Sequence, residues 1–311
     1  MTILKWITKD THIDFMKASV FTYILSTVLV VLSFLSMYYK SFNFGIDFSG
    51  GVLMEIKSEK PINVEEIRSK LSVLKLDELN LQTLGSKGDE LLIRAQAENA
   101  NEEAQRKAVV DIKNILGNGY EYRRIENVGP QVGDELKTAG IIASILAMVA
   151  IAIYIWVRFE WQFALGALIG LFHDIIITLG LLSYFRFDFS LTTVAAILTL
   201  VGYSINDTVV TYDRIRENLK KYRKMPQKEL LNKSINDIFS RTILTGVTTL
   251  CAVIPLYFLG GEALASFSFT ILAGLIIGTY SSIYVCTTFL NLFDLRAVNH
   301  KDEDNVFASI G

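Results

Sequence analysis

The sequence has a low proportion of charged residues and few cysteines and histidines. Only 20% of its 311 residues are charged, whereas 51% are hydrophobic, which is too apolar for an ordinary soluble domain. Its two cysteines, Cys251 and Cys286, lie in apolar segments, where a free cysteine usually behaves as a small buried hydrophobe. The three histidines lie far apart, with no cysteine at metal-ligand spacing. We therefore predict no disulfide, no metal site and no cofactor.

A domain rich in charge of one sign is also missing. The formal net charge is −2, and without a basic domain we predict no nucleic-acid partner. The chain has no Gly-x-x-x-x-Gly-Lys-Ser/Thr loop to bind nucleotide phosphates, so we expect no ATP hydrolysis and no other enzymatic activity. An intramembrane protease using Ser204 with His173 is the enzymatic alternative, but the sequence around Ser204 lacks the closing glycine of a nucleophile elbow.

Long hydrophobic stretches with little or no charge dominate the sequence instead. Each has about 20 or more residues, enough to cross a hydrocarbon core of about 30 Å. They are Ala18 to Tyr39, Thr138 to Val157, Phe163 to Phe185, Leu191 to Tyr212, Thr242 to Gly261, and Ser266 to Phe293. The first has no small-residue cleavage site, so we expect a retained anchor. Glycines four residues apart, at 166 and 170 and at 274 and 278, predict close helix packing.

Basic residues indicate how these spans are oriented. The segment between the fourth and fifth spans contains Arg214, Arg216, Lys220, Lys221, Arg223, Lys224, Lys228 and Lys233. Because cytoplasmic loops carry such an excess, we expect this loop and both termini on the cytoplasmic side of a bacterial inner membrane. The cluster could also contact anionic lipid or bind another protein.

Residues 41–135 interrupt the apolar pattern with the composition of a soluble domain. Strands are expected at Phe44 to Lys57, Asn80 to Leu84, Glu90 to Ala95 and Tyr120 to Val128, and helices at Asn63 to Leu74 and Asn101 to Leu116. The order β-α-β-β-α-β predicts a small α+β ferredoxin-like domain, extracytoplasmic and therefore periplasmic. The expected organisation is residues 1–40 as the N-terminus and first span, 41–135 as this domain, 136–293 as a five-helix membrane region, and 294–311 as a cytoplasmic tail.

A glycine-rich segment, Gly45-Ile46-Asp47-Phe48-Ser49-Gly50-Gly51, opens this domain. Glycine-rich loops can bind phosphate, but no Lys-Ser/Thr follows and no helix is expected to begin there. A strand that enters the domain with a bulge or a sharp bend explains the glycines better, because glycine permits backbone angles that other residues avoid.

Four blocks of sequence carry a resemblance to a known family. The segment from Phe44 to Gly51 looks like a motif at the start of the first external domain of SecD/SecF proteins. The other blocks are Val128 to Gly133, Gly202 to Asn218, and Ser234 to Thr242, in an order and spacing that cover nearly the whole chain. The sequence thus resembles the SecD/SecF family of protein-export membrane proteins, within the resistance-nodulation-division superfamily. The resemblance implies a structural role for the matching motif residues Gly45, Asp47, Gly50, Gly51, Gly129 and Pro130.

The resemblance also implies a function. A chain of this kind pairs with a SecD-like subunit beside the SecY/SecE/SecG channel and uses the proton motive force to help an unfolded, translocating polypeptide leave the channel. This chain has one six-span half, so an obligate partner is expected. A proton-coupled exporter of small molecules from the same superfamily is the alternative, and a purely structural assembly subunit is another.

Asp207 is the leading candidate for a proton-carrying residue. A carboxylate in a membrane span is costly, so such a residue tends to be functional, and Asp207 lies about 9 Å inside the cytoplasmic end of the fourth span. Tyr203, Thr211 and Arg214 share its helix face. Burial favours the neutral form of a carboxyl group and a neighbouring cation favours the charged form, so small rearrangements could load and release a proton.

Three more residues are candidates for the proton relay. Arg241 begins the fifth span on the same side, and the resemblance pairs it with Asp207; a static ion pair is the alternative. His173 and Asp174 lie midway along the third span, where an imidazole could pass protons on. Their spacing places them on adjacent helix faces, so a structural hydrogen bond between helices is an equal alternative.

Overall fold

The structure is a computed structural model that describes residues 11–74, 76–85, 87–97 and 102–296. The chain divides into two compact units. Of the described residues, a helical unit contains 11–42, 146–187 and 195–296, and a small unit contains those within 43–145 and 188–194. The predicted boundary between residues 135 and 136 therefore falls inside the small unit, which also takes in a short segment from between two spans.

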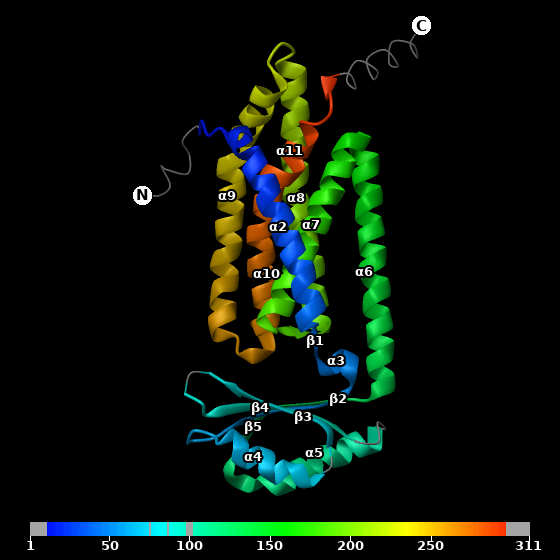
Figure 1. Cartoon of the computed structure of the whole chain (residues 1–311), viewed down its shortest axis with the longest axis vertical. Coiled ribbons are helices and arrows are strands. Elements are labelled where there is room, and N and C mark those ends of the chain that lie inside the picture. Colours follow the sequence, from blue (N-terminus) through cyan, green and yellow to red (C-terminus); the bar gives the residue numbers. More distant parts are fainter. Residues whose placement is uncertain (1–10, 75, 86, 98–101, 297–311) are drawn as a thin grey trace. The chain divides into compact units, whose positions relative to one another are not determined.

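Six long helices dominate the described part of the chain, and each is long and apolar enough to span a membrane. They are α2 (Ser19–Lys40), α6 (Pro130–Arg158), α7 (Trp161–Phe185), α8 (Leu191–Lys221), α9 (Gln227–Leu259) and α10 (Glu262–Ser281) (Figure 1). The predicted number of transmembrane helices is confirmed. Helices α6 and α8 begin in the small unit and continue into the helical unit.

Helices α8 and α9 extend beyond the spans that hydropathy marks. Because α8 runs to Lys221 and α9 begins at Gln227, the basic loop between them is mostly helical, closed by a short turn. The helices are longer than the predicted spans because apolar composition marks only the part of a helix suited to lipid. The helical backbone hydrogen bonds continue into the polar residues that follow. The predicted sixth span is interrupted by a π-helical turn, Ser282–Cys286, before the short α11 (Thr287–Leu290).

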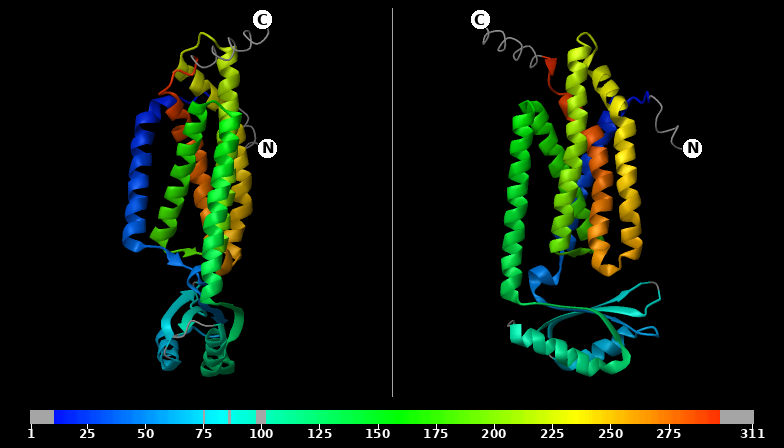
Figure 2. Two further views of the ribbon diagram at one scale, coloured as in Figure 1. Left: turned by 90° about the vertical axis from the view of Figure 1, so that its right-hand side faces the viewer. Right: turned by 180° about the vertical axis from the view of Figure 1, so that it is seen from behind.

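Glycines set the closest approaches between helices in this unit. An added Cβ at Gly166 would lie 2.6 Å from Tyr212 Oη, one at Gly170 would lie 2.2 Å from Cys286 Sγ, and one at Gly274 would lie 2.4 Å from Leu200 Cδ2. These glycines pack as the small-residue spacing predicts. Helix α7 packs against both α2 and α10, and α9 runs beside α10 (Figure 2).

The beginning of the chain is attached to α9 by two asparagines. The Asn236 side chain accepts a hydrogen bond from Ile13 N and donates one to Ile13 O, both at 2.9 Å. Asn232 Oδ1 accepts from Met16 N at 2.9 Å, and its Nδ2 donates to Asp14 Oδ1 at 2.6 Å. This asparagine clasp holds the short helix η1 (Phe15–Ala18), which leads into α2.

The small unit has the predicted ferredoxin-like sheet. Its strands β2 (Gly51–Lys57), β3 (Leu76–Leu84), β4 (Glu90–Ala97) and β5 (Glu121–Val128) pair in the order β3-β4-β2-β5, antiparallel throughout. Helices α4 (Val64–Leu71) and α5 (Glu102–Leu116) cover one face (Figure 1). Their buried side chains Ile67, Leu71 and Ile112 pack with Met54 and Ile56 of β2. The order β-α-β-β-α-β is confirmed.

The first predicted strand, Phe44 to Lys57, is wrong as one continuous element. It is divided into β1 (Asn43–Phe44), the short helix α3 (Ile46–Ser49) and β2. Gly50 and Gly51 separate α3 from β2 with φ angles of 71° and 114°, a region that favours glycine. The expected sharp bend is therefore present. Strand β1 pairs in parallel with β6 (Asp188–Phe189), which lies between α7 and α8.

Candidate functional site

Asp174 is the centre of a buried hydrogen-bond network in the helical unit. It lies midway along α7 and has no exposed surface. Its Oδ2 atom accepts hydrogen bonds from Ser204 Oγ of α8 at 2.6 Å and from Ser281 Oγ of α10 at 2.8 Å. An added Cβ at Gly278 would lie 3.6 Å from the same Oδ2 atom. One carboxyl group thus joins three helices.

His173 belongs to the same network. Its Nδ1 atom lies 3.0 Å from Asp174 Oδ1, so the structure brings together two side chains that were expected on adjacent helix faces. The imidazole stacks on the Tyr280 ring with centroids 6.1 Å apart. Tyr280 Oη donates to the carbonyl oxygen of Thr22 at 2.9 Å and lies 2.9 Å from Ser26 Oγ. The network therefore reaches α2, while His173 Nε2 is buried without a hydrogen-bond partner.

Asp207 lies one helical turn beyond Ser204 on α8. Only 4% of its surface is exposed, and its Oδ2 atom is buried without a hydrogen-bond partner. The polar residues expected around it form hydrogen bonds and ion pairs with groups other than its carboxyl group. Thr211 donates to the backbone carbonyl of Asp207 at 2.9 Å, and Arg214 pairs with Asp237 at 2.8 Å and Glu217 at 2.6 Å.

Arg241 is exposed on α9. Within the described residues the structure contains no ion pair between Arg241 and Asp207, so it does not bring the expected relay pair into direct contact. Helices α8 and α9 do meet near this level, because Thr249 Oγ1 donates to Tyr203 Oη at 3.3 Å. The static ion pair considered for these two side chains is absent from this arrangement.

Two features of the site were missed in the sequence. Ser281 and Tyr280 lie at the end of α10 and were treated as part of an apolar span. The π-helical turn that follows also approaches α8, since Cys286 Sγ lies 3.8 Å from Thr208 Oγ1. Such turns are frequent at functional sites. The hydroxyl-rich run Thr279 to Ser282 was the available signal.

The protease alternative finds no support in this geometry. Ser204 donates its hydroxyl proton to Asp174, and His173 Nδ1 faces the other oxygen of the same carboxyl group. The alternative requires His173 as the base within hydrogen-bond reach of Ser204, and no hydrogen bond joins these two side chains in the part of the chain that the structure describes.

The glycine-rich motif forms a loop in the small unit, and its matching residues have distinct contacts. Gly45 N donates to Phe189 O at 2.9 Å, and Asp47 Oδ2 accepts from Leu191 N at 2.9 Å. Gly129 O accepts from Gly133 N at 2.9 Å where α6 begins at Pro130.

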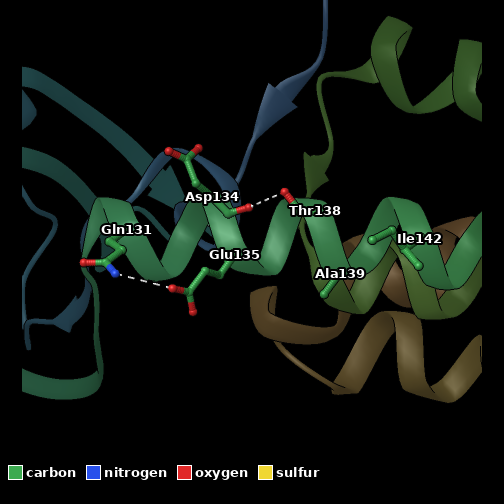
Figure 3. Close-up of a pocket in the computed structure, with 6 residues that line it drawn as sticks. All are labelled: Gln131, Asp134, Glu135, Thr138, Ala139 and Ile142. Carbon is green, nitrogen blue, oxygen red and sulfur yellow. Dashed lines mark hydrogen bonds between the residues drawn. The ribbon is translucent and has the colours of Figure 1, made fainter.

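A depression on the first turns of α6 lies outside both the glycine-rich motif and the acid network (Figure 3). It is lined by Gln131, Asp134, Glu135, Thr138, Ala139 and Ile142.

Comparison with known proteins assigns both regions to one family. Residues 109–296 match the family described as protein export membrane protein SecD/SecF, C-terminal, and residues 42–62 match the SecD/SecF GG motif. The chain belongs to the SecD/SecF family. The GG-motif match covers the loop with Asp47, and the larger match covers His173, Asp174, Asp207 and Arg241.

Relatives and solved structures of the SecD/SecF family agree with this assignment. The chain is 46% identical over 292 residues to the protein translocase subunit SecF of Rickettsia conorii, covering 93% of this chain and 94% of the relative. It is 44% identical over 302 residues to the SecF of Rickettsia prowazekii, covering 96% of each chain. These relatives are named as translocase subunits, which supports the protein-export expectation over the small-molecule exporter.

The crystal structure of SecDF from Thermus thermophilus, a translocon-associated membrane protein, matches with a TM-score of 0.81 and 33% identity over 91% of this chain. SecDF in a super-membrane-facing form matches with a TM-score of 0.66 and 32% identity over 97% of this chain. The chain spans only 39% and 40% of those two SecDF chains. It thus corresponds to less than half of a SecDF polypeptide.

Proposed function

We propose that this chain is a SecF-type subunit of protein translocase. It pairs with a SecD-like half, lies beside the SecY/SecE/SecG channel in a bacterial inner membrane, and uses the proton motive force to promote late translocation of unfolded secreted chains. Membership of the SecD/SecF family supports this proposal, as does the match over 94% and 96% of two relatives named protein translocase subunit SecF. On the topology given by the basic residues, both termini are cytoplasmic and residues 41–135 are periplasmic.

The buried acid network is the observation that carries the proposal. Two carboxyl groups, Asp174 and Asp207, lie inside apolar spanning helices, where ionisable groups are costly and usually serve a function. Asp174 is fully engaged by hydroxyl and imidazole groups. Asp207 retains one carboxyl oxygen without a partner. We assign proton uptake and release to Asp207. Ser204, one helical turn before it on α8, bonds to Asp174, and we assign Asp174 and His173 of α7 as a second pair that shares the proton.

Arg241 is assigned to the second state of this cycle. In the arrangement described here it is exposed and forms no ion pair with Asp207. A shift of α9 relative to α8 would bring a cation to the carboxyl group and favour its charged form. The two arrangements would then differ by one proton bound to Asp207. A proton gradient can shift the equilibrium between two such arrangements.

The partner is inferred from polar side chains on the outer surfaces of two spanning helices. Thr199 and Asn206 are exposed on α8, and Arg241 and Thr248 are exposed on α9. Polar groups within a membrane avoid lipid and face protein or a water-filled cavity. We infer that the SecD-like half covers these surfaces and completes the proton path.

The gradient is large enough for this role. A potential of about 150 to 200 mV supplies roughly 3.5 to 4.5 kcal/mol for each proton. To reverse a 1:99 equilibrium fully takes about 5.5 kcal/mol, so one proton gives a strong bias and two give a complete reversal.

Asp207→Asn tests the proposal, because asparagine keeps the shape of the side chain but cannot ionise. The variant is reconstituted with its SecD-like partner and the channel, and late export is measured with and without a proton gradient. We expect loss of the gradient-stimulated component with normal insertion and partner recovery. Asp213→Asn is the matched control, since Asp213 lies on the same helix but pairs with Arg158 at 2.7 Å outside the acid network. Normal stimulation in Asp207→Asn would refute the relay and favour a structural assembly subunit.

A further inference from the structure

The GG loop, residues 45–51, lies against the first turns of two long helices. An added Cβ at Gly133 of α6 would lie 3.3 Å from Gly50 N and 3.5 Å from Asp47 O. About two turns later on α6, an added Cβ at Gly140 would lie 3.9 Å from Phe48 Cε1 and 3.6 Å from Leu191 Cδ2. The loop thus occupies the space between the starts of α6 and α8.

Asp47 supplies a tertiary cap to α8. The N–H groups in the first turn of a helix have no acceptor within the helix, and Leu191 is the first residue of α8. Its N–H donates to Asp47 Oδ2 at 2.9 Å, from a residue 144 positions away in the sequence. The negative charge also suits the positive end of the helix dipole. The local cap is weaker, because Thr193 N reaches Ser190 Oγ only at 3.4 Å.

The segment just before α8 is attached to the same small unit by other contacts. Strand β6 pairs with β1, and Asn43 Nδ2 donates to Asp188 Oδ1 at 2.6 Å. Arg94 of β4, a strand of the main sheet, forms an ion pair with Asp188. Asp188 O in turn accepts from Thr193 Oγ1 of α8 at 2.7 Å. The ferredoxin-like domain therefore holds α8 by its first turn through several polar contacts.

We infer that Asp47 is a positioning residue for energy coupling: by capping α8, it ties the ferredoxin-like domain to the helix that carries Asp207. Asp207 lies 16 residues along α8, or about 24 Å at the helical rise. A continuous helix is a rigid element that can carry a displacement over this distance. A change at the proton site is then passed to the domain through the end of α8. This inference rests on the proposed function, because it supplies the mechanical link that gradient-driven export requires.

Two pairs of variants separate the cap from other effects. Asp47→Ala removes the acceptor, while Asp47→Asn retains an oxygen that caps helices about as well as aspartate. Leu191→Pro removes the donor at the first helical position, where proline is tolerated, and Leu191→Ala removes the side chain but keeps the N–H group. Each full-length variant is reconstituted with its partner and the channel, and export is measured with and without a gradient.

We expect Asp47→Ala and Leu191→Pro to lower the gradient-stimulated component about fivefold, the size of effect that the loss of one helix cap predicts. Asp47→Asn and Leu191→Ala retain most of it, and gradient-independent export is the same in all four. The inference is overturned if both cap-deleting variants are stimulated as well as wild type, or if Asn is as defective as Ala. A parallel fall in gradient-independent export also overturns it, because a merely structural defect lowers both components.

Asp207→Asn, measured beside these variants, distinguishes the two levels of the argument. If it loses stimulation while Asp47→Ala and Leu191→Pro retain it, the relay stands and the link through Asp47 fails. If Asp207→Asn is itself stimulated normally, the proposed function fails. Should Asp47→Ala not accumulate in the membrane, the Leu191 pair decides, because its substitutions leave Asp47 in place.

Discussion

Asp174 of α7 and Ser204 of α8 are joined by a hydrogen bond of 2.6 Å between Oδ2 and Oγ. Both side chains are buried, and the same carboxyl oxygen also accepts from Ser281 of α10. A buried acceptor that loses a donor retains the cost of its desolvation. The packing of α7, α8 and α10 therefore depends on the hydrogen bonds that the Asp174 carboxyl group accepts.

The first prediction concerns that hydrogen bond. Ser204→Ala leaves Asp174 with one hydroxyl donor fewer, and we expect the free energy of unfolding to fall by about 1 to 3 kcal/mol. The measurement is thermal or denaturant unfolding of the purified chain in mild detergent. Thr199→Ala is the control, because the exposed Thr199 hydroxyl donates to Ala195 O of its own helix; it should change stability by less than about 0.5 kcal/mol. Equal effects of the two substitutions would contradict the prediction.

Arg241 gives a graded prediction. Lysine keeps the charge but not the planar donor fork of arginine, whereas methionine removes both. We expect gradient-stimulated export to fall in the order wild type, Arg241→Lys, Arg241→Met. The assay is the one used for Asp207→Asn, with partner recovery checked for each variant. If the methionine variant performs as well as wild type, Arg241 has no electrostatic role in the cycle.

A third prediction tests helix packing. An added Cβ at Gly180 would lie 2.3 Å from Ser33 Cβ and 2.6 Å from Ser33 Cα, so Gly180→Ala has to push α7 away from α2. Overpacking of this kind costs about 1 to 3 kcal/mol. Gly202→Ala is the matched control, since Gly202 is also helical but nothing lies within 4 Å of its added Cβ. Unfolding in detergent should show Gly180→Ala destabilised and Gly202→Ala unchanged or slightly stabilised; the reverse order would refute the packing.

Hydropathy and periodicity were sufficient for much of the fold. Six spans could be predicted because each is a run of about 20 apolar residues. Such a run can be recognised without knowledge of any tertiary contact. The ferredoxin-like order followed for a similar reason, since side chains such as Ile67 and Leu71 repeat along α4 with helical spacing. Helix α3 was missed because four residues between glycines carry no periodicity, and its place depends on β6, far away in the sequence.

The site was only partly predictable. An aspartate within a run of apolar residues is conspicuous in the sequence, so Asp174 and Asp207 were both predicted as candidates. Their partners were not, because Ser204 and Ser281 lie 30 and 107 residues from Asp174 and serine is common in spanning helices. Arg214 shared a helix face with Asp207 by spacing, yet its long side chain pairs with Asp237. Sequence spacing predicts the helix face on which a residue lies, but it does not predict which group the end of a long, flexible side chain contacts.

The asparagine clasp has a consequence for the time course of synthesis. Residues 13–16 leave the ribosome early, but Asn232 and Asn236, which bond to them, follow more than 210 residues later. At about 5 to 20 residues per second, that interval lasts roughly 10 to 45 seconds. For this period the first helix is in the membrane with its entry segment unattached. Truncated chains that end before residue 232 should therefore leave residues 13–16 open to protease, and chains that extend past α9 should protect them.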